Sequence, residues 1–271
     1  MSAAGQGAAA PLVAARGVAW EAGGRCVVGP LDLEVTAGEC LVIVGPNGAG
    51  KTSLIRLLTG LLEPSAGGLA WRGTAYGEHS RRDLARRIAY VPQIRPARVP
   101  LTVEEVVLLG RHPHLGRFQL APRPEDHEAV AEALDRVGIG ALRQRPVDEL
   151  SGGERQSVYI AAAFAQQAEL LVLDEPTTHL DPRHQGEVAS LLARLARGGD
   201  RTVVAASHDL TFAALVADRL VALAEGRIVA DGTPAEILRP EVLESLFGSR
   251  FELVGSAERP VPVLVLDGEG R

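Results

Sequence analysis

Residues 45–54 read GPNGAGKTSL, and the choice of fold rests on this stretch. Gly45, four further residues, Gly50, Lys51 and Thr52 spell G-x-x-x-x-G-K-[ST], a loop whose backbone N–H groups cradle phosphate. Glycine lets the chain curl so that successive N–H groups point at one anion. Lys51 is the only lysine among 28 basic residues, so the other 27 (28 − 1) are arginine. Because an ammonium is narrower than a guanidinium and can enter such a curl, we interpret Lys51 as a phosphate ligand rather than a chance residue in a glycine turn.

The segments around this loop predict a strand before it and a helix after it. Residues 40–44 are continuously apolar, which is typical of a strand buried on both faces. Residues 52–59 predict a helix closed by Gly60. Residues 31–35 alternate between apolar and polar side chains, which favours a half-exposed antiparallel strand. Further strands are predicted at 87–91, 170–175 and 202–207, and a hairpin is predicted at 219–232.

A second phosphate-handling element ends the apolar run at 170–173. Asp174 and Glu175 follow directly, as when a buried strand delivers carboxylates to the sheet edge where ligands bind. Mg²⁺ prefers hard oxygen ligands, so we expect Asp174 to serve the ion together with the Thr52 hydroxyl. Glu175 would lie beside the γ-phosphate and take a proton from the attacking water. Two acids after a strand are more often a solvated turn, but their pairing with the loop favours the catalytic interpretation.

A long helical stretch at 94–165 divides this α/β pattern. Apolar residues recur there at helical spacing, as at Ala129, Val130, Ala133, Leu134 and Val137. We therefore predict an α/β fold: a P-loop NTPase (RecA-like) core with an antiparallel β subdomain and an inserted α-helical subdomain. The predicted segments are a disordered tail at 1–11, an ATPase domain at 12–247 and a C-terminal extension at 248–271. Within the ATPase domain, the core covers about 12–93 and 166–247, and the helical subdomain about 94–165. The stretch at 260–271 is expected to form at most one edge strand.

Composition and charge exclude several classes of function. The net charge of −6 and the pI of about 5.7 do not support a basic stripe for nucleic acid. No run of about 18 apolar residues predicts a membrane span. Residues 1–11 lack the basic and apolar regions of a signal peptide. Cys26 and Cys40 form no C-x-x-C pair, so we expect two small buried apolar residues in a reducing compartment.

The stretch LSGGERQ at 150–156 distinguishes between families that share the phosphate loop. It resembles the signature of ATP-binding cassette (ABC) proteins, and the resemblance covers nearly the whole chain. Other motifs of that family follow in order: Gln93 in YVPQ resembles the Q-loop, Asp181 in HLD the D-loop and His208 in ASHD the switch histidine. Trp20 stands about where an aromatic residue of the family stacks on adenine, although AWEAGGR carries a small insertion there.

The resemblance implies a role for each matching residue. ATP is bound by Trp20 and by the loop residues Gly45, Pro46, Asn47, Gly48, Ala49, Gly50, Lys51, Thr52 and Ser53. Three residues act in catalysis: Glu175 as the base, His208 as the holder of γ-phosphate and nucleophile, and Gln93, which joins Thr52 and Asp174 around Mg²⁺. Two copies are expected to pack head to tail, with each ATP between the loop of one copy and the signature of the other. The signature residues are Ser151, Gly152, Gly153 and Glu154, at a helix start where N–H groups can face an anion.

The resemblance also indicates what the ATPase drives. The chain has a single cassette, and only 58 residues (151 − 93) separate Gln93 from Ser151, which is too short for long coiled-coil arms. We expect two copies to dock, as peripheral subunits, on two transmembrane permease subunits at the cytoplasmic side of the cell (inner) membrane, with a substrate-binding protein as an indirect partner. The stretches at 101–118, 176–185 and 229–238 are similar to importers of iron–siderophore complexes, haem or cobalamin. The alternatives are an ABC ATPase of another transporter class, for zinc, manganese or lipid, and a soluble ABC switch protein.

Four histidines invite a metal interpretation. His112 and His114 flank a proline, and His179 and His184 are five residues apart, so neither pair has the i, i+4 spacing of a helical zinc site. We interpret them as surface or permease-contact residues.

Overall fold

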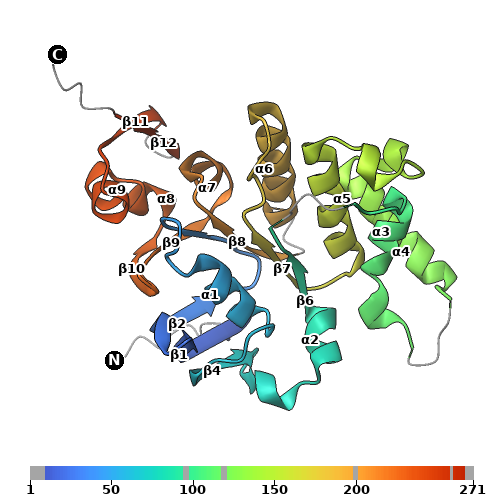
Figure 1. Cartoon of the computed structure of the whole chain (residues 1–271), viewed down its shortest axis with the longest axis horizontal. Helices are drawn as coiled ribbons and strands as arrows, with labels where there is room; N and C mark the ends of the chain where they lie inside the picture. Colours follow the sequence, from blue (N-terminus) through green and yellow to red (C-terminus); the bar gives the residue numbers. More distant parts are fainter. Residues whose placement is uncertain (1–9, 94–97, 117–120, 198–200, 257–258, 266–271) are drawn as a thin grey trace, which may run out of the picture.

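The computed structural model describes residues 10–93, 98–116, 121–197, 201–256 and 259–265. Its central sheet contains β3 (Cys40–Val44), β6 (Ile88–Val91), β7 (Leu170–Asp174), β8 (Thr202–Ser207), β9 (Arg219–Ala224) and β10 (Arg227–Gly232). The strand order is β10-β9-β3-β8-β7-β6 (Figure 1). Five of these strands pair in parallel, and β10 pairs antiparallel with β9. The predicted buried strands and the predicted hairpin are therefore confirmed.

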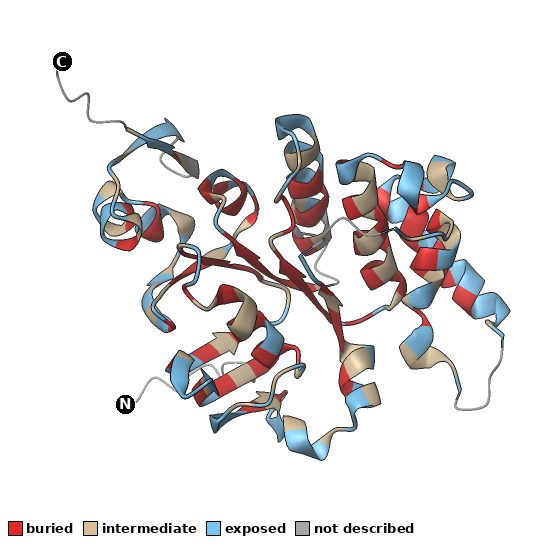
Figure 2. Ribbon diagram, in the orientation of Figure 1, coloured by how far each residue is buried: buried red, intermediate tan, exposed pale blue. Residues whose placement is uncertain are grey.

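Burial of β3 on both faces explains why its sequence is continuously apolar. Side chains of a strand alternate between its two faces, and both faces of β3 are covered. Leu41 and Ile43 pack in a core that includes residues of helix α1 (Lys51–Leu58), whereas Cys40, Val42 and Val44 pack in a second core with residues of the helical segment. All residues of β3 are buried (Figure 2). The phosphate loop thus lies between a strand fixed on both sides and a helix that packs beside it.

An antiparallel sheet lies beside the central sheet (Figure 1). Its strands are β1 (Val13–Ala22), β2 (Arg25–Val35), β4 (Ala66–Trp71) and β5 (Thr74–Ala75), in the order β2-β1-β4-β5. In β2, Leu31, Leu33 and Val35 are buried while Asp32 between them is exposed. The predicted half-exposed antiparallel strand is confirmed, and the alternation reflects one apolar face turned to the core.

The helical segment lies at one end of the central sheet (Figure 1). It contains α3 (Val103–Leu109), α4 (Pro124–Val137) and α5 (Gly152–Ala165). The apolar face of α4 is buried at the positions that the spacing predicted: Ala129, Val130, Ala133, Leu134 and Val137. A buried ion pair joins Arg111 Nε to Asp126 Oδ1 at 2.9 Å, and Arg111 also donates to the carbonyl of Ala165 at 2.7 Å. Arg111 therefore links the region after α3 to both α4 and the end of α5. Residues 94–97 and 117–120 of the predicted subdomain lie outside the described residues.

The remaining helices connect and cover the strands. They are α2 (Arg81–Arg87), α6 (Pro182–Arg197), α7 (Leu210–Val216), α8 (Pro234–Ile237) and α9 (Pro240–Phe247). Short 3₁₀ turns occur at Tyr76–Glu78, His112–His114, Gly140–Leu142 and Val147–Glu149.

In the C-terminal extension, the described part of 260–271 contributes one strand, which agrees with the expectation for that stretch, but a second strand that was not predicted precedes it. The extension forms a two-stranded antiparallel sheet of β11 (Phe251–Ser256) and β12 (Arg259–Leu264). The strand that the sequence reading missed is β11. Its first residue, Phe251, stacks edge-on against Phe247 of α9, with ring centroids 5.9 Å apart. This contact fixes the start of β11 beside the helix before it. The tail predicted at 1–11 falls mainly on residues 1–9, outside the described residues.

The two cysteines do not share one environment, so the expectation of two buried residues was wrong for Cys26. Cys26 is exposed near the turn between β1 and β2, and its thiol donates to the carbonyl of Gly29 at 3.2 Å. Cys40 is fully buried in β3. Burial, with the nearby charges of Asp218 and Glu39, raises the pKa of Cys40 to about 12.

This difference predicts selective thiol chemistry. At about pH 8, an alkylating reagent is expected to modify Cys26 alone in the native chain, because the thiolate is the reactive form and Cys40 is kept protonated and out of reach. Both thiols should react after denaturation. Intact mass spectrometry gives the count, and a Cys26→Ser variant is the control that should take up no reagent while folded. Labelling of Cys40 in the native variant would contradict the burial described above.

Candidate functional site

The phosphate loop has the shape of a cradle because glycine is required at both of its ends. Gly45 has φ 158°, and a Cβ built there would lie 2.1 Å from the carbonyl oxygen of Leu223. Gly50 has φ 99°, and a Cβ there would lie 2.8 Å from the carbonyl oxygen of Val27. No side chain fits at either position without backbone movement. The loop therefore packs closely against the segments that contain Leu223 and Val27, and its opposite side is left open to a ligand.

Lys51 folds back over this loop. Its Nζ donates to the carbonyl oxygens of Gly45 at 2.7 Å and of Pro46 at 3.1 Å. The residue is only 6% exposed. Burial lowers the pKa of Lys51, while the charge of Glu175, whose Oε1 lies 3.6 Å from Nζ, acts in the opposite direction. A positive group is thus held at the mouth of the cradle, where phosphate oxygens would meet it.

Two acidic residues at the end of β7 point toward different partners. Asp174 is buried, and its Oδ1 accepts a hydrogen bond from the Thr52 hydroxyl at 3.0 Å. Its Oδ2 accepts from the Tyr90 hydroxyl at 3.4 Å. Burial raises the pKa of Asp174, and the nearby charge of Glu175 raises it further against the effect of the Thr52 bond. Asp174 thus lies behind Thr52 as the inner carboxylate of the site.

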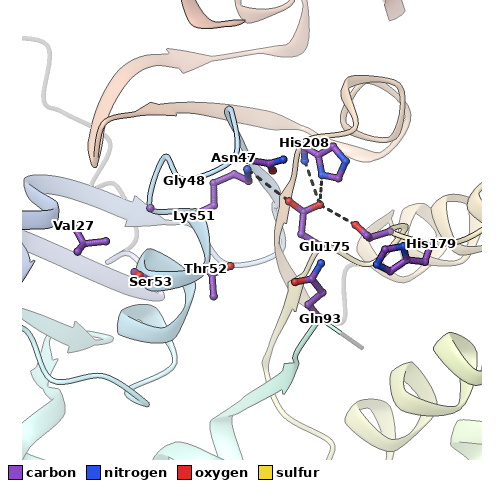
Figure 3. A pocket seen from close by; sticks show the side chains of 12 residues that line it. Val27, Asn47, Gly48, Lys51, Thr52, Ser53, Gln93, Glu175, His179 and His208 are labelled. Carbon is purple, nitrogen blue, oxygen red and sulfur yellow. Dashed lines mark hydrogen bonds and ion pairs between the residues drawn. The ribbon is translucent and has the colours of Figure 1, made fainter. Parts of the chain in front are cut away.

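Glu175 is the outer carboxylate. Its backbone turns at φ 52° directly after β7, while its N–H still donates to the carbonyl of Ala206 on β8 at 2.9 Å. This turn aims the side chain into the pocket rather than along the strand (Figure 3). Oε2 accepts from His208 Nδ1 at 2.7 Å and from the Thr178 hydroxyl at 3.3 Å. With Lys51 on its other oxygen, Glu175 lies between a cation and an imidazole, as a group that handles protons would.

Lys51, Thr52, Glu175 and His208 line one cavity of about 380 Å³, whereas the buried Asp174 does not (Figure 3). Its lining residues are Val27, Asn47, Gly48, Gly50, Lys51, Thr52, Ser53, Gln93, Glu175, Thr178, His179 and His208. Most of the lining was predicted from sequence, and Gln93 reaches it from the end of β6, far from the loop in the chain. Val27, Thr178 and His179 were not predicted. Thr178 and His179 could have been found from the sequence, because they follow shortly after Glu175 in the chain.

Trp20 does not line this cavity. It lies on β1 opposite Val28, half-buried against the core of the antiparallel sheet. Val27, beside that pair, lines the cavity. The stacking of Trp20 on adenine therefore stays a prediction, with Val27 as the apolar residue already at the cavity wall.

The signature residues also lie outside this cavity. Ser151 caps α5: its Oγ accepts from the Glu154 N–H at 3.3 Å, and Glu154 Oε2 accepts from the Ser151 N–H at 2.8 Å. Ser151 and Gly152 are exposed, whereas Gly153 is buried. The start of α5 thus presents a hydroxyl and backbone to the outside of the molecule, apart from the chain's own cradle.

The model of the family described as "ABC transporter" matches residues 28–178. The chain belongs to the ABC transporter family. This ABC transporter subunit is 43% identical to the hemin import ATP-binding protein HmuV of Streptomyces coelicolor, over 89% of this chain and 85% of that protein. It is 37% identical to the iron(3+)-hydroxamate import ATP-binding protein FhuC of Bacillus subtilis, over 89% of both chains. Among solved structures, it resembles a chain of a metal-chelate type ABC transporter in an inward-facing conformation, with 28% identity and a TM-score of 0.80 over 94% of this chain and 97% of that chain.

Membership confirms the predicted family, the α/β cassette fold and the function of an ATP-binding and ATP-hydrolysing subunit that works with permease subunits. In the part of the chain that the structure describes, no helix of this ABC subunit is long and apolar enough to cross a bilayer. The same residues contain no group of three or more His, Cys, Asp or Glu side chains that could hold a metal ion. His114 Nε2 lies 2.8 Å from the carbonyl oxygen of Gln166, and His184 is bound to Asp181.

Proposed function

We propose that this chain powers the import of a metal chelate, an iron–siderophore complex, haem or cobalamin, by closing and reopening an ATP-bound dimer. The observation that carries the proposal is the juxtaposition of Lys51, Glu175 and His208 in one cavity, in a chain similar to importer ATPases. The cavity suits a triphosphate, because it joins a cradle of N–H groups, a cation and a carboxylate.

Each of these residues has a distinct task in the proposed reaction. The loop amides and Lys51 hold the β- and γ-phosphates. Glu175 accepts a proton from the water that attacks the γ-phosphate, and the imidazole of His208, 2.7 Å from Glu175, keeps that carboxylate and the γ-phosphate in place. Gln93 lies at the cavity wall, where its amide can orient the attacking water.

The residues around Thr52 fit a magnesium ion. Thr52 and Asp174 place a hydroxyl and a carboxylate oxygen 3.0 Å apart, and the Gln93 amide adds a third oxygen at the same cavity. Hard oxygens of this kind are the ligands that Mg²⁺ prefers. When bound with ATP, the ion would neutralise charge on the β- and γ-phosphates.

The second half of each site is proposed to come from a second copy of the chain. Ser151 and Gly152 are exposed and lie outside the cradle of their own chain, at the start of a 14-residue helix. N–H groups at such a helix start suit an anion. Two copies packed head to tail would therefore place the signature of one copy over the γ-phosphate held by the other. Loss of that phosphate would remove the contact and let the dimer open.

We place two copies of the chain on the cytoplasmic side of the membrane, docked on two permease subunits that receive cargo from a substrate-binding protein. The descriptions of its relatives support the class of cargo: iron(3+)-hydroxamate for FhuC and hemin for HmuV.

The test is ATPase activity of the complex with its permease in lipid nanodiscs. We expect the rate to rise when the binding protein is added loaded with ferric hydroxamate, haem or cobalamin, and not when the same binding protein is empty. A rate that stays flat with all three chelates, but rises with a zinc- or manganese-loaded binding protein, would contradict the proposed cargo class.

A further inference from the structure

A single segment connects the nucleotide cavity to the signature turn within one chain. It begins at Glu175, and Thr178 and His179 also line the cavity. The residues that follow lie against the signature glycines. A Cβ built on Gly152 would lie 3.6 Å from Leu180 Cδ2 and 3.9 Å from the carbonyl oxygen of His179. The segment from 175 to 184 therefore touches the chain's own phosphate site at its start and its own signature at its end.

The closest of these contacts is made by His184. A Cβ built on Gly153 would lie 2.2 Å from His184 Cδ2 and 2.4 Å from its Cγ. Atoms do not approach so closely, so the imidazole occupies the space that a side chain at position 153 would need. Gly153 is buried at this point, while Ser151 and Gly152 beside it stay exposed.

The imidazole of His184 is itself held in place. Asp181 accepts from the His184 N–H through Oδ1 at 2.9 Å, and its Oδ2 lies 2.8 Å from His184 Nδ1. One carboxylate thus fixes both the backbone and the ring in the first turn of α6. The His184 side chain is 26% exposed, so most of its surface is in contact with protein. Neither Asp181 nor His184 lines the nucleotide cavity.

From this geometry we infer that His184 is a positioning residue for the signature turn. Its ring clamps Gly153 against the segment that begins at Glu175, so the position of Ser151 and Gly152 depends on the state of the chain's own phosphate site. The inference rests on the proposed function, in which those two residues meet the nucleotide of the second copy. It assigns His184 an effect on dimer closure and none on the cradle of its own chain.

The experiment compares His184→Ala with a neighbouring control, Arg183→Ala, both in the Glu175→Gln background that keeps ATP bound. Arg183 makes a surface ion pair with Glu187, and its side chain is 84% exposed. The three atoms nearest a Cβ built on Gly153 all belong to His184 and none to Arg183. With saturating Mg·ATP, sedimentation velocity should show His184→Ala at least about tenfold weaker in dimerisation than the background, because small displacements of positioned groups carry such losses. Arg183→Ala should dimerise like the background. ATP binding to the dilute monomer, measured with a fluorescent nucleotide, should stay within about twofold for both variants.

A second pair of variants tests the clamp directly. Gly153→Ala should weaken dimerisation because its methyl group meets the imidazole, and the double variant Gly153→Ala/His184→Ala should dimerise better than Gly153→Ala alone. Such non-additivity is the mark of a direct contact.

The outcomes separate the inference from the proposal beneath it. Failure of the Glu175→Gln background to dimerise with ATP would overturn the proposed dimer. A background that dimerises, with His184→Ala equally competent or with losses that simply add in the double variant, would overturn the inference alone. Equal loss of monomer ATP binding and dimerisation in His184→Ala would also overturn it, because that result indicates a general structural role.

Discussion

Exchange of Glu175 for glutamine is expected to slow ATP turnover by about 10²-fold or more, the usual size of the loss of a general base. Glutamine has nearly the same shape, so the turn after β7 and the contact with Thr178 should persist. It cannot accept a proton from water at neutral pH. The buried Lys51 also loses the opposite charge 3.6 Å away, which should leave the cradle free to bind the triphosphate. ATP binding and ATP-driven dimerisation are therefore expected to survive the change.

Steady-state phosphate release and a nucleotide-binding titration measure the two halves of this prediction. The matched control is Glu169→Gln, since Glu169 lies just before β7 and pairs with Arg72 at 2.6 Å on the surface, away from the cavity. That variant should keep the wild-type rate. Normal turnover in Glu175→Gln would remove Glu175 from the mechanism.

Mixing two inactive variants is expected to restore ATPase activity if each site is shared between copies. Lys51→Ala destroys the cradle and leaves the signature intact. Ser151→Asp leaves the cradle intact; aspartate still caps the start of α5, but it places a negative charge where the partner's phosphate is proposed to lie. In a mixed dimer, one site combines both defects and the other combines both intact halves. Random pairing makes about half of the dimers mixed, so activity should return to a clear fraction of wild type from nearly none.

Each variant alone, at the total concentration of the mixture, is the control, and both should stay nearly inactive. The ATPase activity of the mixture must rise with the product of the concentrations of the two variants. Two other results count against a shared site: full activity of Ser151→Asp alone, and a mixture that remains as inactive as its components.

Most of the fold could be predicted because its signals are local. The continuous apolar runs of β3, β7 and β8 and the glycine loop each specify their structure over a few residues. The carboxylate that we propose as the catalytic base could be located for the same reason, since Glu175 directly follows a recognisable strand. Helix α4 was predicted from its spacing alone.

The features that were missed depend on contacts between distant residues. Nothing near Val27 in the sequence indicates that the turn between β1 and β2 brings it to the cavity, or that Cys26 beside it is exposed. Strand β11 was missed although its partner β12 lies in the stretch where an edge strand was allowed, because the pairing of the two strands is a contact that the residues of β11 alone do not indicate. His184 was interpreted from the sequence as a surface or permease-contact residue after its metal spacing was rejected. Its contact with Gly153 was not predicted, because it joins residues 31 positions (184 − 153) apart.

Strand β3 belongs to two apolar cores at once, and this has a consequence for nucleotide capture. Separation of β3 from its neighbours would expose both cores, so the amides of Cys40–Val44 should open to solvent only with global unfolding. The receptor for the triphosphate is then preorganised at the end of a strand that is packed on both faces. Little of the affinity for ATP is lost to ordering the loop, and the free energy of binding remains available for drawing two copies together.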